Sequence, residues 1–151
     1  MNKYAKLMLL RLLMSMGCGL AVGAQAGAEP FTKFGDYTVV HSVFGSEFID
    51  ESIASRYNLS RGGDRALLNL SIVKSDAGGK MRGLPAKVSG VVANLMQQQK
   101  TLEFIEIHEG DAVYYLAPFR IYNEEVLHFS LTVEHDNKAY DLKFTKKLYV
   151  D

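Results

Sequence analysis

Cysteine, tryptophan and proline are scarce in this chain, and the scarcity narrows what the protein can be. Its 151 residues include one cysteine, no tryptophan and three prolines. The single cysteine, Cys18, lies near the N-terminus. A chain with one cysteine has no internal disulfide and no thiolate cage for a structural metal. The folded part must therefore be held together by the packing of apolar side chains.

Long hydrophobic runs are also missing, since no stretch reaches the ~20 apolar residues that span a bilayer. The longest mostly apolar segment, residues 12–22, follows a stretch with three cations and no acid (Lys3, Lys6 and Arg11). Two small-residue motifs come next, Ala24-Gln25-Ala26 and Ala26-Gly27-Ala28. This order is typical of a secretory signal peptide over residues 1–28, cleaved after Ala26 or Ala28. We therefore expect a periplasmic protein with no membrane span after cleavage.

Cys18 leaves an alternative to simple cleavage. Gly17 fits the position before a lipidated cysteine, but Ser15 stands where bacterial lipoprotein signals usually carry leucine or a similar residue. Removal of Cys18 with the signal peptide is the favoured interpretation. Lipid attachment at Cys18 and an uncleaved amphipathic anchor stay open as alternatives.

An excess of positive charge is absent as well. The chain has 17 basic and 17 acidic residues, and three of the basic but none of the acidic ones lie within residues 1–28. The remainder therefore carries a net charge of −3. A mildly acidic domain has no electrostatic reason to bind nucleic acid or an anionic membrane, so we expect neither as a partner.

Residues 29–151 do contain a clear pattern, the alternation of apolar and polar residues. Their number suits a single domain. It is clearest over 126–135, where Leu127, Phe129, Leu131 and Val133 alternate with polar residues, and over 140–150. Successive side chains of a strand point to opposite faces, so each run predicts a half-buried strand. Asp136-Asn137 between them predicts a hairpin turn.

Further alternating or β-branched runs predict five more strands, at 37–43, 67–73, 88–93, 102–107 and 112–122. Pro118 indicates an edge position or a bulge in the last of these. Residues 29–33 and 75–84 look poor in core positions, and Gln97-Gln98-Gln99-Lys100 is interpreted as a polar link between strands.

One segment, residues 50–57, is predicted to be helical. Asp50 is a suitable N-cap, and Ile53 and Tyr57 lie one helical turn apart. About seven strands with one short helix favour an all-β fold, an immunoglobulin-like antiparallel β-sandwich.

Several blocks in this order resemble the bacterial family catalogued as domain of unknown function 4426. The resemblance covers roughly residues 34–151 and rests on blocks at 34–39, 57–61, 65–72, 94–95, 109–115, 123–125 and 142–145. It implies an exported β-sandwich and supplies no agreed activity or functional residues. One departure is that Asp50-Glu51 stands at the helix start where the family is expected to have a proline.

The histidines do not form a metal-binding motif. His41, His108, His128 and His135 show no short His–His spacing. Alternation places His128 on the solvent face, His135 beside a turn, and His41 on the face of Val39 and Val43. We interpret them as structural or solvated, with a copper or zinc site across strands, including Met81 or Met96, as the alternative. We predict no cofactor.

Catalytic patterns are equally scarce. The carboxylates Glu103, Glu106, Glu109 and Asp111, and the pair Glu124-Glu125, follow no calcium-loop pattern. Glu103 and Glu106 are expected on opposite faces of one strand. There is no Gly-x-Ser-x-Gly elbow, and the glycine pairs 62–63 and 78–79 precede no phosphate-loop lysine and serine. An enzyme is therefore disfavoured.

Aromatic residues remain as candidates for recognition. Many fall in the C-terminal third, and about half of them must fill a sandwich core (Tyr114, Tyr115, Phe119, Tyr122, Phe129, Tyr140 and Phe144). Others, such as Tyr114 or Tyr149, are candidates for an exposed binding surface. The leading hypothesis is a non-catalytic binding or accessory module that contacts another periplasmic or envelope protein. The alternative is a small-ligand or metal carrier with a pocket between the sheets.

Overall fold

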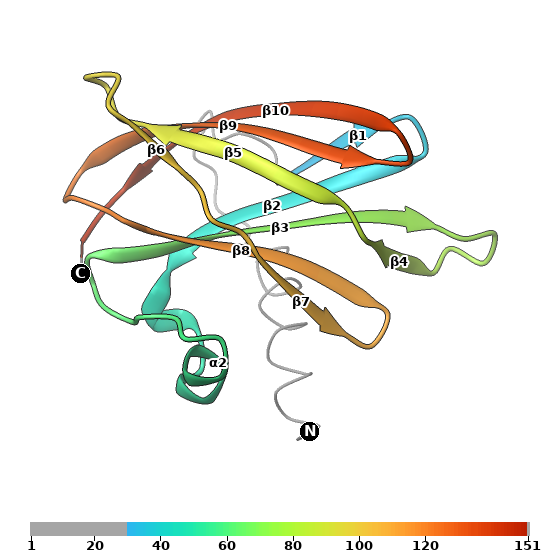
Figure 1. Cartoon of the computed structure of the whole chain (residues 1–151), viewed down its shortest axis with the longest axis horizontal. Helices are drawn as coiled ribbons and strands as arrows, with labels where there is room; N and C mark the ends of the chain where they lie inside the picture. The colour runs from blue at the N-terminus through green and yellow to red at the C-terminus, as the bar shows by residue number, and fades with distance from the viewer. Residues whose placement is uncertain (1–29, 151) are drawn as a thin grey trace, which may run out of the picture.

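Alternation along the chain produces two antiparallel sheets that pack face to face (Figure 1). The computed structural model describes residues 30–150, so the predicted signal peptide, its cleavage sites at Ala26 or Ala28, and Cys18 lie outside the described residues. Within the described residues there are ten strands and one short α-helix. The predicted all-β antiparallel sandwich is confirmed.

The larger sheet has the strand order β1-β2-β3-β8-β7, with β4 also paired to β3. β3 pairs with β8 along residues 65–70 and with β4 along residues 72–75, so β4 lies beyond the start of β8. The strands are β1 (Phe31–Phe34), β2 (Tyr37–Gly45), β3 (Arg65–Ser75), β4 (Met81–Leu84), β7 (Ile105–Glu109) and β8 (Ala112–Arg120). Gly83 permits the close approach of β4 to β8, because a Cβ there would lie 2.5 Å from the backbone nitrogen of Val113.

The smaller sheet has the order β10-β9-β5-β6. Its strands are β5 (Lys87–Ala93), β6 (Gln99–Thr101), β9 (Glu125–His135) and β10 (Lys138–Leu148). The predicted β9–β10 hairpin is confirmed, with His135 opposite Lys138 and Leu148 opposite Glu125. Asp136 and Asn137 both have positive φ, 52° and 56°, as the tight two-residue turn of a twisted hairpin requires.

The main core fills the space between the sheets. The predicted inward residues Leu127, Phe129, Leu131 and Val133 are all at most 4% exposed. Phe129 lies near the centre, stacked on Phe144 at 4.7 Å between ring centroids and edge-on to Phe119. Every second residue of each central strand therefore contributes to one shared apolar layer.

A second apolar cluster covers the outer face of the larger sheet. The 3-10 turn η2 (Ser46–Phe48) and helix α2 (Glu51–Arg56) connect β2 to β3 and lie against that face (Figure 1). Asp50 caps the helix as predicted, because its carboxylate accepts a hydrogen bond from the Ser52 backbone N–H at 2.8 Å. Ile53 packs beside Leu67 and Tyr114 in this cluster. The central strand β3 is therefore buried on both faces.

Three strands were missed by the prediction of about seven. β1 and β4 fall in the segments 29–33 and 75–84 that look poor in core residues, and β6 falls in the predicted polar link at 97–100. All three are short and contain no fully buried residue, so their sequences carry too little signal to mark a half-buried strand. The predicted strand at 102–107 is wrong at its start, since residues 102–104 connect β6 in one sheet to β7 in the other.

Pro118 lies at an edge position, as predicted, because β8 has a neighbouring strand on both sides over only part of its length. β7 pairs with β8 only from Ala112 to Leu116, so Pro118 has β3 as its one sheet neighbour. The predicted strand 112–122 ends earlier, at Arg120.

The connections between strands gather at two opposite ends of the sandwich (Figure 1). The end we call the turn end holds the short connections 35–36, 76–80, 110–111 and 136–137. The end we call the loop end holds residues 46–64, 94–98 and 121–124 and the C-terminal residues 149–150. No helix of the described residues is long and apolar enough to cross a membrane, since α2 has six residues.

Candidate functional site at the loop end

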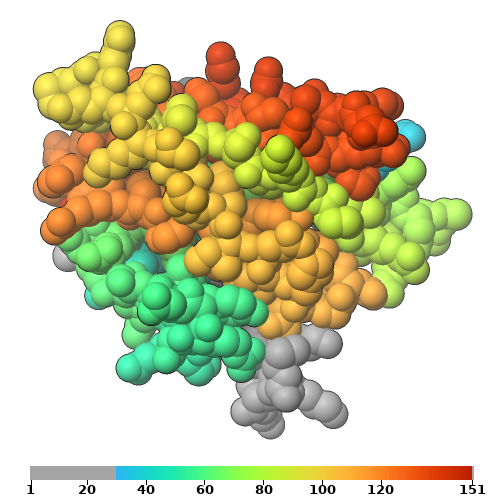
Figure 2. Space-filling model, viewed as in Figure 1, coloured from blue at the N-terminus to red at the C-terminus, as the bar shows by residue number. Residues whose placement is uncertain are grey.

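Large apolar side chains are exposed mainly at the loop end. Five of the seven large hydrophobic residues that the described part of the chain exposes lie there, each between 58% and 75% exposed (Phe48, Leu95, Met96, Tyr122 and Tyr149). We call these five residues the loop-end group. In the space-filling view, the turn that carries Leu95 and Met96 protrudes at the upper left (Figure 2).

Strand register places four members of the group in a row along the end of the smaller sheet. Tyr149 follows β10, Tyr122 precedes β9, and Leu95 and Met96 follow β5. Because β10, β9 and β5 are neighbours in the sheet, these three connections are neighbours too. Phe48 ends the turn that follows β2 and so belongs to the other layer.

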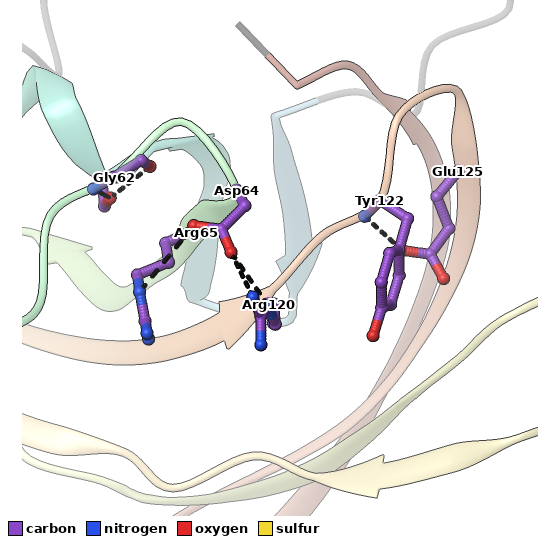
Figure 3. Close-up of polar contacts among 7 residues, drawn as sticks. Gly62, Asp64, Arg65, Arg120, Tyr122 and Glu125 are labelled. Carbon is purple, nitrogen blue, oxygen red and sulfur yellow. Dashed lines mark hydrogen bonds and ion pairs between the residues drawn. The ribbon is translucent and has the colours of Figure 1, made fainter.

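Hydrogen bonds hold these connections in place. The Tyr122 backbone N–H donates to a Glu125 carboxylate oxygen at 3.0 Å (Figure 3). The Val150 backbone N–H donates to the side-chain oxygen of Asn123 at 3.1 Å, which ties the C-terminal residues to the β8–β9 loop. In the β5–β6 turn, the Gln98 backbone N–H donates to the Asn94 side-chain oxygen at 3.0 Å. The apolar side chains therefore project from connections with defined shapes.

A polar network lies on the larger-sheet side of the loop end (Figure 3). The Arg120 guanidinium contacts one Asp64 carboxylate oxygen through Nε at 2.9 Å and Nη2 at 2.8 Å. The hydroxyl of Ser46, which is 1% exposed, accepts from the Gly62 N–H at 2.9 Å and donates to the Gly62 carbonyl at 3.1 Å. These contacts join η2, the segment before β3 and the end of β8 into one support.

The chemistry of the loop-end group favours recognition. Tyrosine, methionine, phenylalanine and leucine supply large contact areas, and aromatic residues and methionine are enriched where proteins meet. The loop end is therefore suited to holding another apolar surface.

A cleft of about 420 Å³ opens on one side of the sandwich, between β1 and β10. Its lining is Phe31, Thr32, Lys33, His41, Leu142, Lys143 and Phe144. The His41 ring is 5% exposed and stacks on Phe144, with 4.2 Å between centroids. This is a pocket of the kind that the carrier alternative requires, at the margin of the two sheets.

Contacts between the layers bound this cleft at both ends. Toward the turn end, the rings of Phe34 and Tyr140 lie 4.7 Å apart. Toward the loop end, the Lys146 ammonium donates to the Val43 carbonyl at 2.8 Å and so links β10 to β2. Lys146 lies on the inward face between Phe144 and Leu148, and its partial burial lowers the pKa of its amino group.

The structure separates the four histidines. His41 is buried in β2, and His128 is exposed in β9, where it contacts the Thr145 hydroxyl; both placements confirm the prediction. His135 lies beside the β9–β10 turn against the Pro85 carbonyl, and His108 pairs with Glu106. Within residues 30–150, no three His, Cys, Asp or Glu side chains are placed to hold a metal ion. Met81 and Met96 lie at opposite ends of the sandwich.

The predicted positions of two site candidates are wrong. Glu103 and Glu106 do not share a strand, because Glu103 precedes β7. Tyr114, predicted to be exposed, is 4% exposed and packs in the cluster under α2. The predicted exposure of Tyr149 is confirmed.

Burial has a chemical consequence for two adjacent tyrosines. It raises the pKa of the Tyr114 phenol, with a smaller contribution from the Glu109 charge. It also raises the pKa of the Tyr115 phenol, although the Ala86 N–H that donates to this oxygen at 2.7 Å opposes the shift. Both phenols are therefore held in their neutral form.

Phe48 and Leu95 were not recognised as surface residues from the sequence. Leu95-Met96 stands between Asn94 and three glutamines. Two large apolar residues inside an otherwise polar turn would have been the signal, because such a turn has no core to bury them.

Comparison with protein families gives one result over nearly all of the described residues. The model of the family described as "Domain of unknown function (DUF4426)" matches residues 31–151. A comparison with curated proteins finds no match.

Several solved chains are similar, and two of them are described next. A DUF4426 family protein from Pseudomonas aeruginosa PAO1 shares 30% sequence identity, with a TM-score of 0.71, over 80% of this chain and 94% of that one. FetP from the uropathogenic Escherichia coli strain F11 has a TM-score of 0.61 over 85% of this chain and 99% of that one. Its identity of 14% shows a shared fold alone.

Proposed function

The chain belongs to the DUF4426 family, and from that premise we propose that it is a non-catalytic periplasmic module that binds another envelope protein through its loop end. The observation that carries this proposal is the loop-end group. Four of its members lie in a row on neighbouring connections of the smaller sheet, each more than half exposed. Exposed apolar residues of this size, gathered in one region, mark interaction sites on soluble domains.

Two further observations support the proposal. The connections that carry the group are hydrogen-bonded into fixed shapes, which lowers the entropy lost when a partner binds. The signal-like sequence at 1–28 supports a periplasmic location, and the structurally similar FetP was recombinantly expressed in the periplasm of E. coli.

Site-specific photocrosslinking in the periplasm of the native host tests the proposal. A photoreactive amino acid replaces Met96 or Tyr122 at the loop end, and Met81 serves as the control. Met81 is 56% exposed and lies at the turn end, so it matches the test positions in exposure but not in location. We expect a discrete crosslinked product from Met96 and Tyr122 and none from Met81.

A matched pair of variants then ties the product to the apolar contacts. Leu95→Ser combined with Met96→Ser should reduce crosslinking from position 122 by about tenfold or more, as expected for central contact residues. Met81→Ser should leave it unchanged. Equal crosslinking from Met81, or no product from either loop-end position, would refute the proposal.

A further inference from the structure

Easily oxidised side chains are scarce in the part of the chain that the structure describes. Four of the six methionines lie within residues 1–28, which leaves Met81 and Met96. Residues 30–150 contain no cysteine and no tryptophan. Thiols and thioethers are the groups on which mild oxidants act, and their susceptibility follows exposure. An oxidant that reaches this domain therefore meets two sulfur atoms.

Both thioethers lie on the surface, at opposite ends of the sandwich. Met96 lies in the β5–β6 turn at the loop end and is 75% exposed, whereas Met81 begins β4 at the turn end and is 56% exposed. Neither side chain belongs to one of the two apolar clusters that hold the fold together. A change in the chemistry of either sulfur therefore alters one end of the surface and leaves the core intact.

Hydrogen bonds close the β5–β6 turn without using the Met96 side chain. The Asn94 backbone N–H donates to the Gln98 carbonyl at 3.1 Å, and the Asn94 side-chain amide donates to the Gln98 side-chain oxygen at 2.7 Å. The Gln97 N–H donates to the Asn94 carbonyl at 3.0 Å. The turn therefore keeps its shape whatever the oxidation state of the sulfur, and it continues to present Met96 to solvent.

The surroundings of Met96 make its oxidation state matter for binding. Leu95 precedes it, and Tyr122 lies on the neighbouring connection of the smaller sheet, so Met96 is part of an apolar surface. A thioether is apolar, whereas a sulfoxide is polar and chiral. A partner that covers the loop-end group would have to bury the new oxygen, and burying a polar group without a hydrogen bond is unfavourable. Oxidation of Met96 therefore opposes binding at the loop end.

From these features we propose that the Met96 sulfur is an oxidation site and that its conversion to the sulfoxide releases the partner from the loop end. The proposal rests on the function proposed above for the loop end. The oxidant is a two-electron oxygen donor, of which hydrogen peroxide is the simplest. Sulfur bonds to one peroxide oxygen as the O–O bond breaks, and the proton on that oxygen passes to the departing hydroxide to give water. Sulfur loses two electrons, and the peroxide gains them.

Peptide mass spectrometry of the mature protein, treated with hydrogen peroxide, tests the modification by itself. We expect one added oxygen at Met96, formed at least as fast as at Met81 because Met96 is more exposed. A Met96 that stays reduced while Met81 is oxidised would overturn the site. The midpoint of urea unfolding should not move, since neither thioether lies in the core. A lowered midpoint would mean that oxidation acts on the fold, and it would overturn the proposal.

Photocrosslinking from position 122 then tests the consequence for binding. The purified protein is oxidised, freed of peroxide and added to an untreated envelope extract of the native host, so the partner itself is never oxidised. For each variant, the product formed after oxidation is divided by the product formed before it, so differences in basal binding cancel. We expect an about tenfold loss in the protein that keeps both methionines and in Met81→Leu. Met96→Leu, which stays apolar but has no sulfur, should show no loss.

The remaining outcomes decide between two failures. An equal loss in Met96→Leu, or no loss in a protein that carries the sulfoxide at position 96, would overturn the proposal. Methionine sulfoxide reductases with a dithiol, which becomes a disulfide as the oxygen leaves as water, should restore the product. A loss that persists after this reduction also counts against it. Absence of product from the unoxidised protein refutes the binding function of the loop end itself, and the oxidation switch with it.

Discussion

The turn end and the loop end of the sandwich use different kinds of connection. At the turn end, three hairpins close with two residues each, and Gly35, Gly110, Asp136 and Asn137 adopt left-handed backbone conformations with φ between 52° and 60°. At the loop end no connection is a two-residue hairpin, the longest has 19 residues between β2 and β3 (46–64), and these connections carry most of the exposed loop-end group.

The two ends therefore differ in what they contribute, strand register at one and exposed side chains at the other. A two-residue turn fixes strand register, and a slip of one residue would move every inward side chain to the solvent face. The turn end therefore determines which residues enter the core. Much of the loop end does not set strand register. Its side chains are therefore available to contact a partner.

Truncation of Phe129 should have the largest effect, because the core supports both ends. Phe129→Ala removes a ring that packs against Phe119 and Phe144, and should lower the free energy of unfolding by about 3–5 kcal/mol. Urea unfolding measures the loss. A change below about 1 kcal/mol would mean that β9 faces the other way.

Substitution at Asn137 should have an intermediate effect on stability. Comparing it with a substitution at the loop end distinguishes the roles of the two ends. Asn137→Val places a β-branched residue at a φ of 56° and should cost about 1–3 kcal/mol of unfolding free energy. Asn137→Gly, which adopts this conformation readily, should retain full stability. Met96→Ser at the loop end should change stability by less than about 0.5 kcal/mol. If Met96→Ser costs as much as Asn137→Val, the division between the ends is wrong.

Alkaline pH should produce the smallest effects on stability, with opposite signs for the two buried tyrosines and for Lys146. The pKa of Tyr114 and of Tyr115 is raised above 10.0 in the folded state, so the unfolded chain loses these protons first. Their contribution to stability is complete below pH 10 and falls as the pH rises beyond it. Tyr114→Phe should therefore flatten the decline of unfolding free energy between pH 10 and 11.

Lys146 should act in the opposite direction. Its pKa is lowered below 10.5 in the folded state, so the unfolded chain binds the proton more strongly. Its contribution to stability rises as the pH approaches 10.5 from below, and Lys146→Met should remove that rise. Urea titrations of both variants from pH 8 to 11 measure the two slopes. Identical slopes for wild type and both variants would contradict the assigned directions of the pKa shifts.

Sequence patterns predicted the long strands and the helix because these elements are half-buried. The alternation in β9 and the Asp50 cap each reflect one face in the core and one in solvent. The short strands β1, β4 and β6 bury little, so they left no such pattern. Tyr114 was misplaced because α2 and the residues that flank it cover the outer face of the larger sheet, and local alternation contains no information about distant coverage.

The two candidate sites were harder to foresee for the same reason. The loop-end group comprises residues 48, 95, 96, 122 and 149, which come to one end of the sandwich only through the order β10-β9-β5 and the stacking of the sheets. The cleft likewise joins β1 to β10, the first and last strands described. Local alternation placed His41 on the face of Val39 and Val43, but it contains no information about what lies across from that face.

The contact between Lys146 and Val43 also affects how copies of this chain meet each other. β10 is an 11-residue edge strand, and long free edges invite pairing with the same edge of another molecule. Lys146 is an inward-pointing charged residue on this edge strand, and inward-pointing charges are one of the devices that protect natural edge strands from pairing with another copy.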